Sequence, residues 1–227
     1  MKQFNEEEQE RFWSFINYGW HGEHVSKKVL KLAGKHIGKK ALDVGAGNGA
    51  LMLNFKKIYG KKKEITAIDI SPKRKDIKKG SCTNLKFKDN LFDTIFLTDV
   101  IEHLSDKDIK KALNEIRRVL NEEGTFVLTT IEERDLTQNS VKCPDCGCVF
   151  HHWGHCQLFT RKRLSDLLKK NGFEIIDLRL FNIDLMATFG PLASLFYLLR
   201  LNRVFKYHFF NRDIFAVARK SKSLKSN

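Results

Sequence analysis

The sequence predicts an α/β fold built on one mainly parallel β-sheet. Short apolar runs alternate with segments of helical periodicity, which is the pattern of a parallel sheet covered by helices. One of these runs leads directly into a turn with three glycines, as expected where a strand ends beside a ligand. The 227 residues, 42% of them hydrophobic, suit a single domain, 1–227, with a substantial core.

Seven segments are the predicted strands. In chain order they are 41–44, 64–69, 76–81, 92–98, 124–130, 174–180 and 214–218. Two helices, at 6–18 and 24–32, are predicted before the first strand. The prediction rests on apolar residues that recur with helical spacing. We expect these helices to form an N-terminal helical flap, 1–38, over the ligand.

Further helices are predicted between the strands. One occupies 50–59, immediately after the glycine turn. Another follows Ser105, which together with Asp108 forms a capping signal. The apolar residues of this helix share one face: Ile109, Ala112, Leu113, Ile116 and Leu120. A third helix runs over 160–170 and stops at Asn171-Gly172.

The first strand and its turn read Ala41-Leu42-Asp43-Val44-Gly45-Ala46-Gly47-Asn48-Gly49. Glycines let the backbone approach a ligand that a β-carbon would block, and the following helix directs its N-terminus at the bound group. Asp43 suits a cofactor that brings a cationic amino-acid portion, whereas it would repel a pyrophosphate. Asp69, at the end of the second strand, can accept hydrogen bonds from ribose hydroxyls. The pattern favours S-adenosylmethionine over a nicotinamide dinucleotide.

As a set, these motifs resemble those of class I S-adenosylmethionine-dependent methyltransferases, in particular the group that includes quinone-biosynthesis methyltransferases. Residues 43–49 match the first motif of that family, 68–71 the second and 92–104 the fourth. The resemblance implies a Rossmann-like, seven-stranded, mainly parallel sheet and methyl transfer to a small-molecule or lipid-like acceptor, with oxygen as the favoured atom. An RNA methyltransferase, and a non-catalytic metal-bound interaction module that kept the fold, are the alternatives.

The residues expected to hold the cofactor are Asp43, Gly45, Ala46, Gly47, Asn48, Asp69, Ile70, Ser81, Cys82 and Asp99. One part of this set departs from the family. Only 71–75 stand where the family usually has a helix, which is followed by a strand ending in an acidic residue that contacts adenine. That acidic position aligns with Ser81, so we expect adenine to rest on Ser81, Cys82 and backbone groups.

Asp99, Glu102 and His103 follow the fourth strand at the edge of the sheet where ligands bind. His103 and Glu102 are the catalytic candidates. In one interpretation His103 takes the proton of an acceptor hydroxyl. In a second, the three side chains hold a divalent cation, as in relatives with a Glu-x-x-Glu-His motif, although Asp99 shortens the reach at its first position. In a third, Glu102 and His103 only cap the loop and bond the neighbouring helix.

The stretch 132–158 is a Cys/His-rich insertion. Cys143-x-x-Cys146 and His151-x-x-x-His155 supply two sulfurs and two imidazoles, the donors of a tetrahedral structural zinc site. The alternative ligands are His152, Cys148 and Cys156, and a Cys143/Cys146 redox pair is a less favoured interpretation. By resemblance, His155 has another role open to it, because a histidine at this position in related methyltransferases faces the acceptor pocket as a base or catalytic-metal ligand.

Charge and apolar content bear on location and partners. The net charge of +14, from 41 Lys and Arg against 27 Asp and Glu, is spread along the chain and does not favour a nucleic acid partner. The insertion 184–208 holds an apolar run, 185–199, that is shorter than the ~20 residues of a membrane span. With the basic residues after it, 185–206 is an interfacial membrane contact, a lid over an apolar pocket, or a core or dimer helix.

The ends of the chain complete the expectations. The polar, acidic start predicts no signal peptide, so a cytoplasmic protein, with peripheral membrane contact as an option, is expected. The tail, 219–227, is basic. Tyr18, Trp20 and His21 are expected near the mouth of the site, whereas Trp13 is expected to anchor the core of the N-terminal helices.

Overall fold

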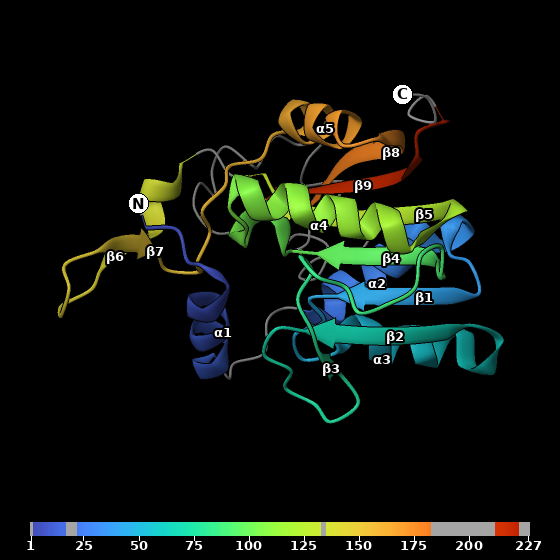
Figure 1. The fold of residues 1–227 in the computed structure, drawn as a ribbon, viewed down its shortest axis with the longest axis horizontal. Helices are drawn as coiled ribbons and strands as arrows, with labels where there is room; N and C mark the ends of the chain where they lie inside the picture. The colour runs from blue at the N-terminus through green and yellow to red at the C-terminus, as the bar shows by residue number, and fades with distance from the viewer. Residues whose placement is uncertain (1, 17–21, 133–134, 183–211, 223–227) are drawn as a thin grey trace, which may run out of the picture.

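The fold is described from a computed structural model of the chain (Figure 1). The structure describes residues 2–16, 22–132, 135–182 and 212–222. The predicted insertion at 184–208, the expected mouth residues Tyr18, Trp20 and His21, and the last part of the predicted tail lie outside the described residues. Within the described ranges, no helix combines the length and the apolar character needed to cross a bilayer.

A central sheet in the described residues has seven strands in the order β3-β2-β1-β4-β5-β9-β8. These are β1 (Lys40–Val44), β2 (Glu64–Asp69), β3 (Lys78–Lys79), β4 (Phe92–Thr98), β5 (Leu120–Ile131), β8 (Phe173–Asn182) and β9 (Arg212–Lys220). The strands from β3 to β5 pair in parallel, and β9 is antiparallel to both of its neighbours. The predicted seven-stranded, mainly parallel sheet is therefore confirmed.

Helices cover both faces of this sheet (Figure 1). They are α1 (Glu6–Phe15), α2 (Gly22–Ala33), α3 (Ala50–Tyr59), α4 (Asp106–Val119) and α5 (Arg161–Lys170), with the short 3-10 helices η1 (Gly34–His36), η2 (Gly60–Lys62), η3 (Ile101–His103) and η4 (Leu136–Asn139). α2 and α3 share one apolar cluster with the sheet, and α4 and α5 share another. Ala41 and Leu42 enter different clusters because successive strand residues face opposite sides.

The predicted helix signals act as expected. Ser105 Oγ accepts a hydrogen bond from the Asp108 backbone N–H at 3.2 Å, which starts α4. Thr160 Oγ1 accepts one from Arg163 N–H at 3.2 Å and starts α5. α5 ends just before Gly172, whose φ of +81° is the left-handed conformation that terminates helices. Both helices therefore lie where the sequence places them.

Several boundaries differ from the prediction. β3 is shorter than 76–81, and β5 starts earlier because Leu120 pairs with Phe92 of β4. β9 continues to Lys220, whose ammonium donates to Asn90 Oδ1 at 2.7 Å and Glu122 Oε1 at 3.1 Å, so the tail begins later than 219. The Cys/His-rich stretch forms an unpredicted hairpin of β6 (Ser140–Lys142) and β7 (Val149–His151), which is too short for a periodic signal.

Candidate cofactor and acceptor site

The glycine turn lies at the carboxyl end of β1, between β2 and β4. Gly45, Gly47 and Gly49 all have positive φ, which side chains rarely adopt. At Gly45 a β-carbon would also lie 2.3 Å from Val100 Cγ2, so a side chain cannot fit there. At Gly47 a β-carbon would meet nothing within 4 Å, which leaves this part of the turn open to a ligand.

A cavity of about 500 Å³ opens beside this turn. Every residue expected to hold the cofactor lines it: Asp43, Gly45, Ala46, Gly47, Asn48, Asp69, Ile70, Ser81, Cys82 and Asp99. His103 lines the same cavity, whereas Glu102 does not. β4, which leads to His103, and β2, which ends at Asp69, lie on opposite sides of β1, so the cavity spans the ends of three neighbouring strands.

Asp69 holds the glycine turn in place. Its Oδ2 accepts a hydrogen bond from Gly47 N–H and its Oδ1 one from Ser71 N–H, both at 2.7 Å. Each carboxylate oxygen has two lone pairs, so both keep capacity for a further donor such as a sugar hydroxyl. Asp69 therefore orders the turn and presents acceptors to the cavity.

Asp43 is completely buried beneath the turn. Neither of its oxygens accepts a well-aligned hydrogen bond within the described part of the chain. Burial, followed by the charge of Asp69, raises the pKa of Asp43 to about 7. A buried carboxyl in this condition gains from a cationic ligand, because the cation restores the charge that burial disfavours.

Ser81 and Cys82 follow β3 and border the cavity beside Asp69. They stand where the sequence comparison with the family predicted that a helix and an acidic residue are missing. Ser81 Oγ lies 2.9 Å from Thr83 Oγ1, within hydrogen-bond distance. Burial raises the pKa of the Cys82 thiol to about 12, which favours the neutral thiol over the thiolate at this wall of the cavity. The wall at this place offers a hydroxyl, a thiol and backbone groups to a ligand.

Asp99 has a strained backbone at the end of β4. Its φ is +53°, in the left-handed region where Asp is more tolerated than most residues. Its Oδ1 accepts a hydrogen bond from Thr129 Oγ1 at 2.9 Å, which holds the carboxylate against β5. Such strain at the end of a central strand is typical of functional sites.

A cluster of imidazoles and one carboxyl lies beyond Asp99. Donor atoms of Glu102, His103 and His155 lie within 4.8 Å of one another. The rings of His103 and His155 are 4.9 Å apart, and His151 stacks on His155 at 4.4 Å. Glu102 Oε2 accepts a hydrogen bond from Thr130 Oγ1 at 3.0 Å, while its Oε1 has no hydrogen-bond partner in the described residues.

Burial sets the protonation of this cluster. Burial, followed by the charge of His155, lowers the pKa of His103 to about 3, so its imidazole is neutral at physiological pH. Burial, followed by the charge of Asp99, raises the pKa of Glu102 well above its usual range. A neutral imidazole facing a cavity can accept a proton or bind a metal ion.

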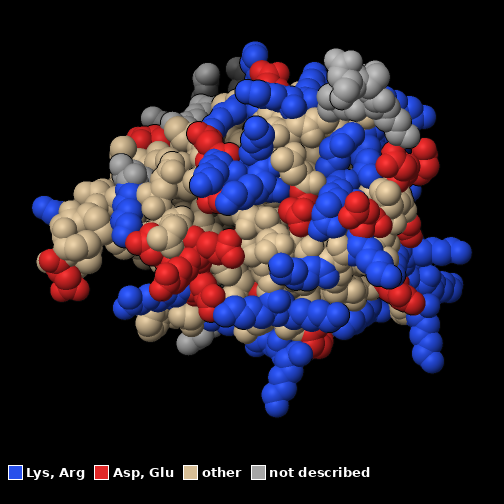
Figure 2. Space-filling model, viewed as in Figure 1, with Lys and Arg blue, Asp and Glu red and all other residues tan. Residues whose placement is uncertain are grey.

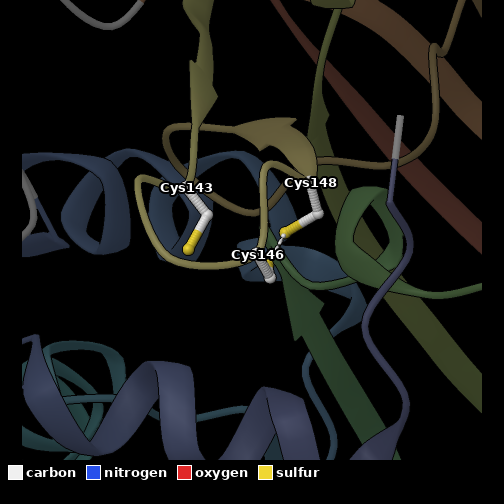
Figure 3. A group of neighbouring side chains, drawn as sticks. All are labelled: Cys143, Cys146 and Cys148. Carbon is white, nitrogen blue, oxygen red and sulfur yellow. Dashed lines mark hydrogen bonds between the residues drawn. The ribbon is translucent and has the colours of Figure 1, made fainter.

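The cysteines and histidines predicted as one zinc site do not meet. Cys143 and Cys146 converge with Cys148 at the tip of the hairpin (Figure 3), whereas His155 belongs to the Glu102 cluster. The cause is the hairpin itself, because His151 pairs with Ser140 at its base, about 10 Å of strand away from Cys148. The structure therefore does not bring the predicted two cysteines and two histidines together as one group, and zinc binding by this set stays a prediction.

Residues of α1 contribute more to the cavity than the sequence indicated. Trp13, expected to be a core anchor, lines the cavity, and its ring meets that of His103 edge-on at 4.9 Å. Gln9 Nε2 donates to the His103 carbonyl at 2.8 Å. Trp153, between the two histidines of the insertion, also lines it. The flap prediction located α1, but helical periodicity does not distinguish residues over a cavity from residues over a core.

Comparisons with known proteins agree with this geometry. The family described as "Methyltransferase domain" matches residues 12–178. An uncharacterized protein of Methanocaldococcus jannaschii is 33% identical over 132 residues, which are 52% of this chain and 54% of that protein. A demethylmenaquinone methyltransferase of Staphylococcus aureus is 32% identical over 114 residues, 44% of this chain and 46% of the relative. The chain thus spans about half the length of the curated relatives it matches.

Solved structures share the fold at lower identity. The 1,6-didemethyltoxoflavin-N1-methyltransferase of Burkholderia thailandensis, solved with S-adenosylhomocysteine, superposes with a TM-score of 0.61 at 17% identity, covering 89% of this chain and 80% of that one. A methyltransferase of Methanosarcina mazei gives 0.59 at 17% identity, over 84% and 97%. From the family match, the sheet order and the glycine turn, we conclude that this chain belongs to the class I S-adenosylmethionine-dependent methyltransferases.

Proposed function

We propose that this protein transfers a methyl group from S-adenosylmethionine to the oxygen of a small, largely apolar acceptor. One observation carries the proposal: all the residues expected to hold the cofactor line a single cavity that also contains His103, Trp13 and Trp153. A volume of about 500 Å³ lies in the range of small-molecule sites.

The charge of the cavity wall supports the cofactor. Its acidic and basic side chains, apart from His103 and the Cys82 thiol, are the carboxyl groups of Glu6, Asp43, Asp69, Asp99 and Asp108 and the ammonium of Lys73. This excess of acidic groups favours a sulfonium with an ammonium group and disfavours a chain of phosphates. The same excess opposes the RNA alternative.

The aromatic side chains support the class of acceptor. Trp13 and Trp153 offer large apolar surfaces beside His103, which favour a planar or greasy molecule. The names of the compared methyltransferases, for demethylmenaquinone and for 1,6-didemethyltoxoflavin, each specify a small molecule. The two tryptophans and the names of these enzymes both support a small molecule as the methyl acceptor of this protein.

The chain supplies alignment and a proton acceptor. Asp43, Asp69 and the glycine turn would hold S-adenosylmethionine. When bound, this cofactor supplies an electrophilic methyl group. Trp13 and Trp153 orient the acceptor, which is the main source of rate in such a transfer. His103 takes the hydroxyl proton as the methyl group passes from the sulfonium sulfur to the acceptor oxygen, and the buried Glu102 carboxyl lies beside the His103 imidazole.

A metal-assisted form of this reaction is the second candidate. The donor atoms of Glu102, His103 and His155 lie close enough to bind one divalent cation. In this set His155 replaces Asp99, which the sequence analysis named as the third ligand. Activity lost on chelation and restored by Mg²⁺ or Mn²⁺ would favour this form, and activity unaffected by chelation would favour proton removal by His103.

The proposal is tested by incubating the protein with S-adenosylmethionine and a panel of phenols, hydroquinones, aromatic amines and isoprenoid alcohols, with mass spectrometry of the products. The expected result is a gain of one methylene on a hydroxylated aromatic acceptor, absent in Asp69→Ala. Methylation of amines or carbon alone would contradict the choice of oxygen. Failure to bind either S-adenosylmethionine or S-adenosylhomocysteine would contradict the function itself.

A further inference from the structure

Three thiols converge at the tip of the β6–β7 hairpin, outside the cavity. The sulfur atoms of Cys143, Cys146 and Cys148 lie within 4.8 Å of one another and point inward from one short loop (Figure 3). The loop is closed by a hydrogen bond from Cys143 N–H to the Cys148 carbonyl at 2.9 Å. Gly147, with φ +69°, turns the chain between Cys146 and Cys148 so that both face Cys143.

Apart from Phe150, His151 and one backbone hydrogen bond with Lys2, the hairpin has few contacts that hold it to the rest of the described protein. It projects from the body of the protein (Figure 1), and its strands are three residues each. None of the buried apolar clusters of the described residues includes a residue of 140–150, and Val149 is 41% exposed. An isolated two-stranded hairpin is at best marginally stable in water, so an additional cross-link is expected.

We propose that Cys143, Cys146 and Cys148 bind one Zn²⁺ as thiolates, with a water molecule as the fourth ligand. Soft sulfur donors select Zn²⁺, and tetrahedral Zn–S bonds of 2.3 Å place neighbouring sulfurs about 3.8 Å apart. The three sulfurs already lie within 4.8 Å of one another, and the 3.1 Å between those of Cys146 and Cys148 would widen by roughly 0.7 Å on metal binding. Three protons leave as the metal binds, and the site carries one net negative charge, beside the ammonium of Lys2.

The site connects to the flap. Lys2 N–H donates to the Val149 carbonyl at 2.7 Å, next to the metal loop. The Phe4 ring packs between Phe150 of β7 and Phe12 of α1, at 5.5 and 5.3 Å. α1 then reaches the cavity through Trp13. Zinc that holds the hairpin therefore also holds the start of the chain and positions α1 over the cavity.

The first test is the zinc content of the intact protein after dialysis, measured by plasma mass spectrometry. We expect one zinc per chain in the wild type and almost none in Cys146→Ser or Cys148→Ser. Cys156→Ser is the matched control, because Cys156 lies outside the cluster and donates to the Leu104 carbonyl. It is expected to keep its zinc. Circular dichroism verifies that each variant is folded.

Cys148→Ser separates this site from the set of two cysteines and two histidines. That set does not use Cys148, so zinc retained in Cys148→Ser would overturn the proposal. A wild-type protein without zinc and lighter by two hydrogen atoms, as in a Cys146–Cys148 disulfide, would also overturn it. Replacement by Co²⁺ gives a further readout, because thiolate ligands produce a charge-transfer band that Cys148→Ser is expected to weaken.

The link to the flap is measured by hydrogen exchange. Removal of the metal is expected to speed exchange at Lys2 and along α1 by about tenfold, while β1 and β4 stay protected. Added Zn²⁺ restores the slow exchange. Unchanged exchange in α1 after complete metal loss would show that zinc does not hold the flap. Zinc content, the Co²⁺ spectrum and hydrogen exchange are all measured without methyl transfer. Their results therefore test the zinc site independently of the proposed function.

Discussion

At the residue scale, we assign two roles to Asp69: contact with the sugar of the cofactor and stabilisation of the glycine turn. Sequence patterns indicate only the first. The position of this carboxylate at the end of a strand predicts contact with a sugar. The structure adds that it accepts hydrogen bonds from Gly47 and Ser71, so the shape of the turn depends on it. Loss of the carboxylate is therefore expected to remove the proposed contacts with the ligand and also to loosen the glycine turn.

Asp69→Ala is expected to weaken binding of S-adenosylhomocysteine roughly 100-fold, or by about 3 kcal/mol, because hydrogen bonds to a charged group are lost. Isothermal titration calorimetry measures the change. Asp166→Ala is the control, since Asp166 pairs with Lys162 on the surface of α5. A dissociation constant within twofold of wild type in Asp69→Ala would refute this role.

The raised pKa of Asp43 predicts that cofactor binding depends on pH. Because burial raises its pKa to about 7, the carboxyl is mostly protonated in the empty site at about pH 6 and ionised at about pH 8. A cationic ligand binds the ionised form, so affinity is expected to rise over this interval. Calorimetry across it, with Asp43→Asn as the variant that loses the dependence, checks the assignment. Equal affinity at both ends would contradict it.

The same pKa shift affects stability in the absence of ligand. Between about pH 4 and about pH 7 the folded state keeps a proton on Asp43 that the unfolded chain has released. The contribution of Asp43 to the free energy of unfolding therefore falls as pH rises through this window. Asp43→Asn is expected to be more stable than wild type at about pH 8 and to bind cofactor less well. If both effects are found, Asp43 favours cofactor binding at a cost in the stability of the empty protein.

His103 is expected to affect the chemical step more than binding. His103→Gln should lower kcat by about 100-fold with little change in the affinity for S-adenosylhomocysteine, because general-base catalysis is lost. Since its pKa is about 3, kcat at saturating cofactor should show no rise near pH 6.5. His36→Gln, in η1 and outside the lining of the cavity, is the control. A normal kcat in His103→Gln would exclude the residue as the base.

At the element scale, α1 closes the cavity that β1, β2 and β4 open. Trp13→Ala is expected to raise KM for the acceptor about tenfold while the cofactor dissociation constant changes little, because the ring covers His103. Phe15→Ala on the same helix is the control, since that side chain is 75% exposed. An equal effect of both variants would mean that α1 acts only through its overall stability.

Elements with strong periodic or capping signals are those that the sequence predicts well. Continuous apolar runs locate β1, β2 and β4, and Ser105 locates the start of α4. The β6–β7 hairpin carries no such signal, because three-residue strands have no measurable period. The predicted zinc ligands are not brought together for a related reason: spacing indicates which donors are present, but the hairpin register decides which of them meet.

At the scale of the whole molecule, the basic surface and the acidic cavity have different roles. Lys and Arg side chains are distributed over much of the face shown in Figure 2, while acidic side chains gather near the N-terminal ends of α1 and α4. Glu6 and Asp108, at those ends, line the cavity. The formal charge of +14 therefore does not act at the site itself.

This charge distribution predicts weak, nonspecific association with nucleic acid. Binding to bulk tRNA is expected at low ionic strength and is expected to be lost near about 0.15 M salt, because scattered contacts with phosphates release few counterions. Fluorescence anisotropy over a salt series measures it. Tight binding that persists at this salt concentration would favour the RNA methyltransferase alternative.

The most direct test of the central claim is a crystal structure of the protein with S-adenosylhomocysteine. We expect the ribose hydroxyls at Asp69, the adenine beside Ser81 and Cys82, and the ammonium group on the side of Asp43. The sulfur should face the part of the cavity that holds His103. A ligand bound elsewhere, or a cavity that stays closed to it at saturating concentration, would contradict the account.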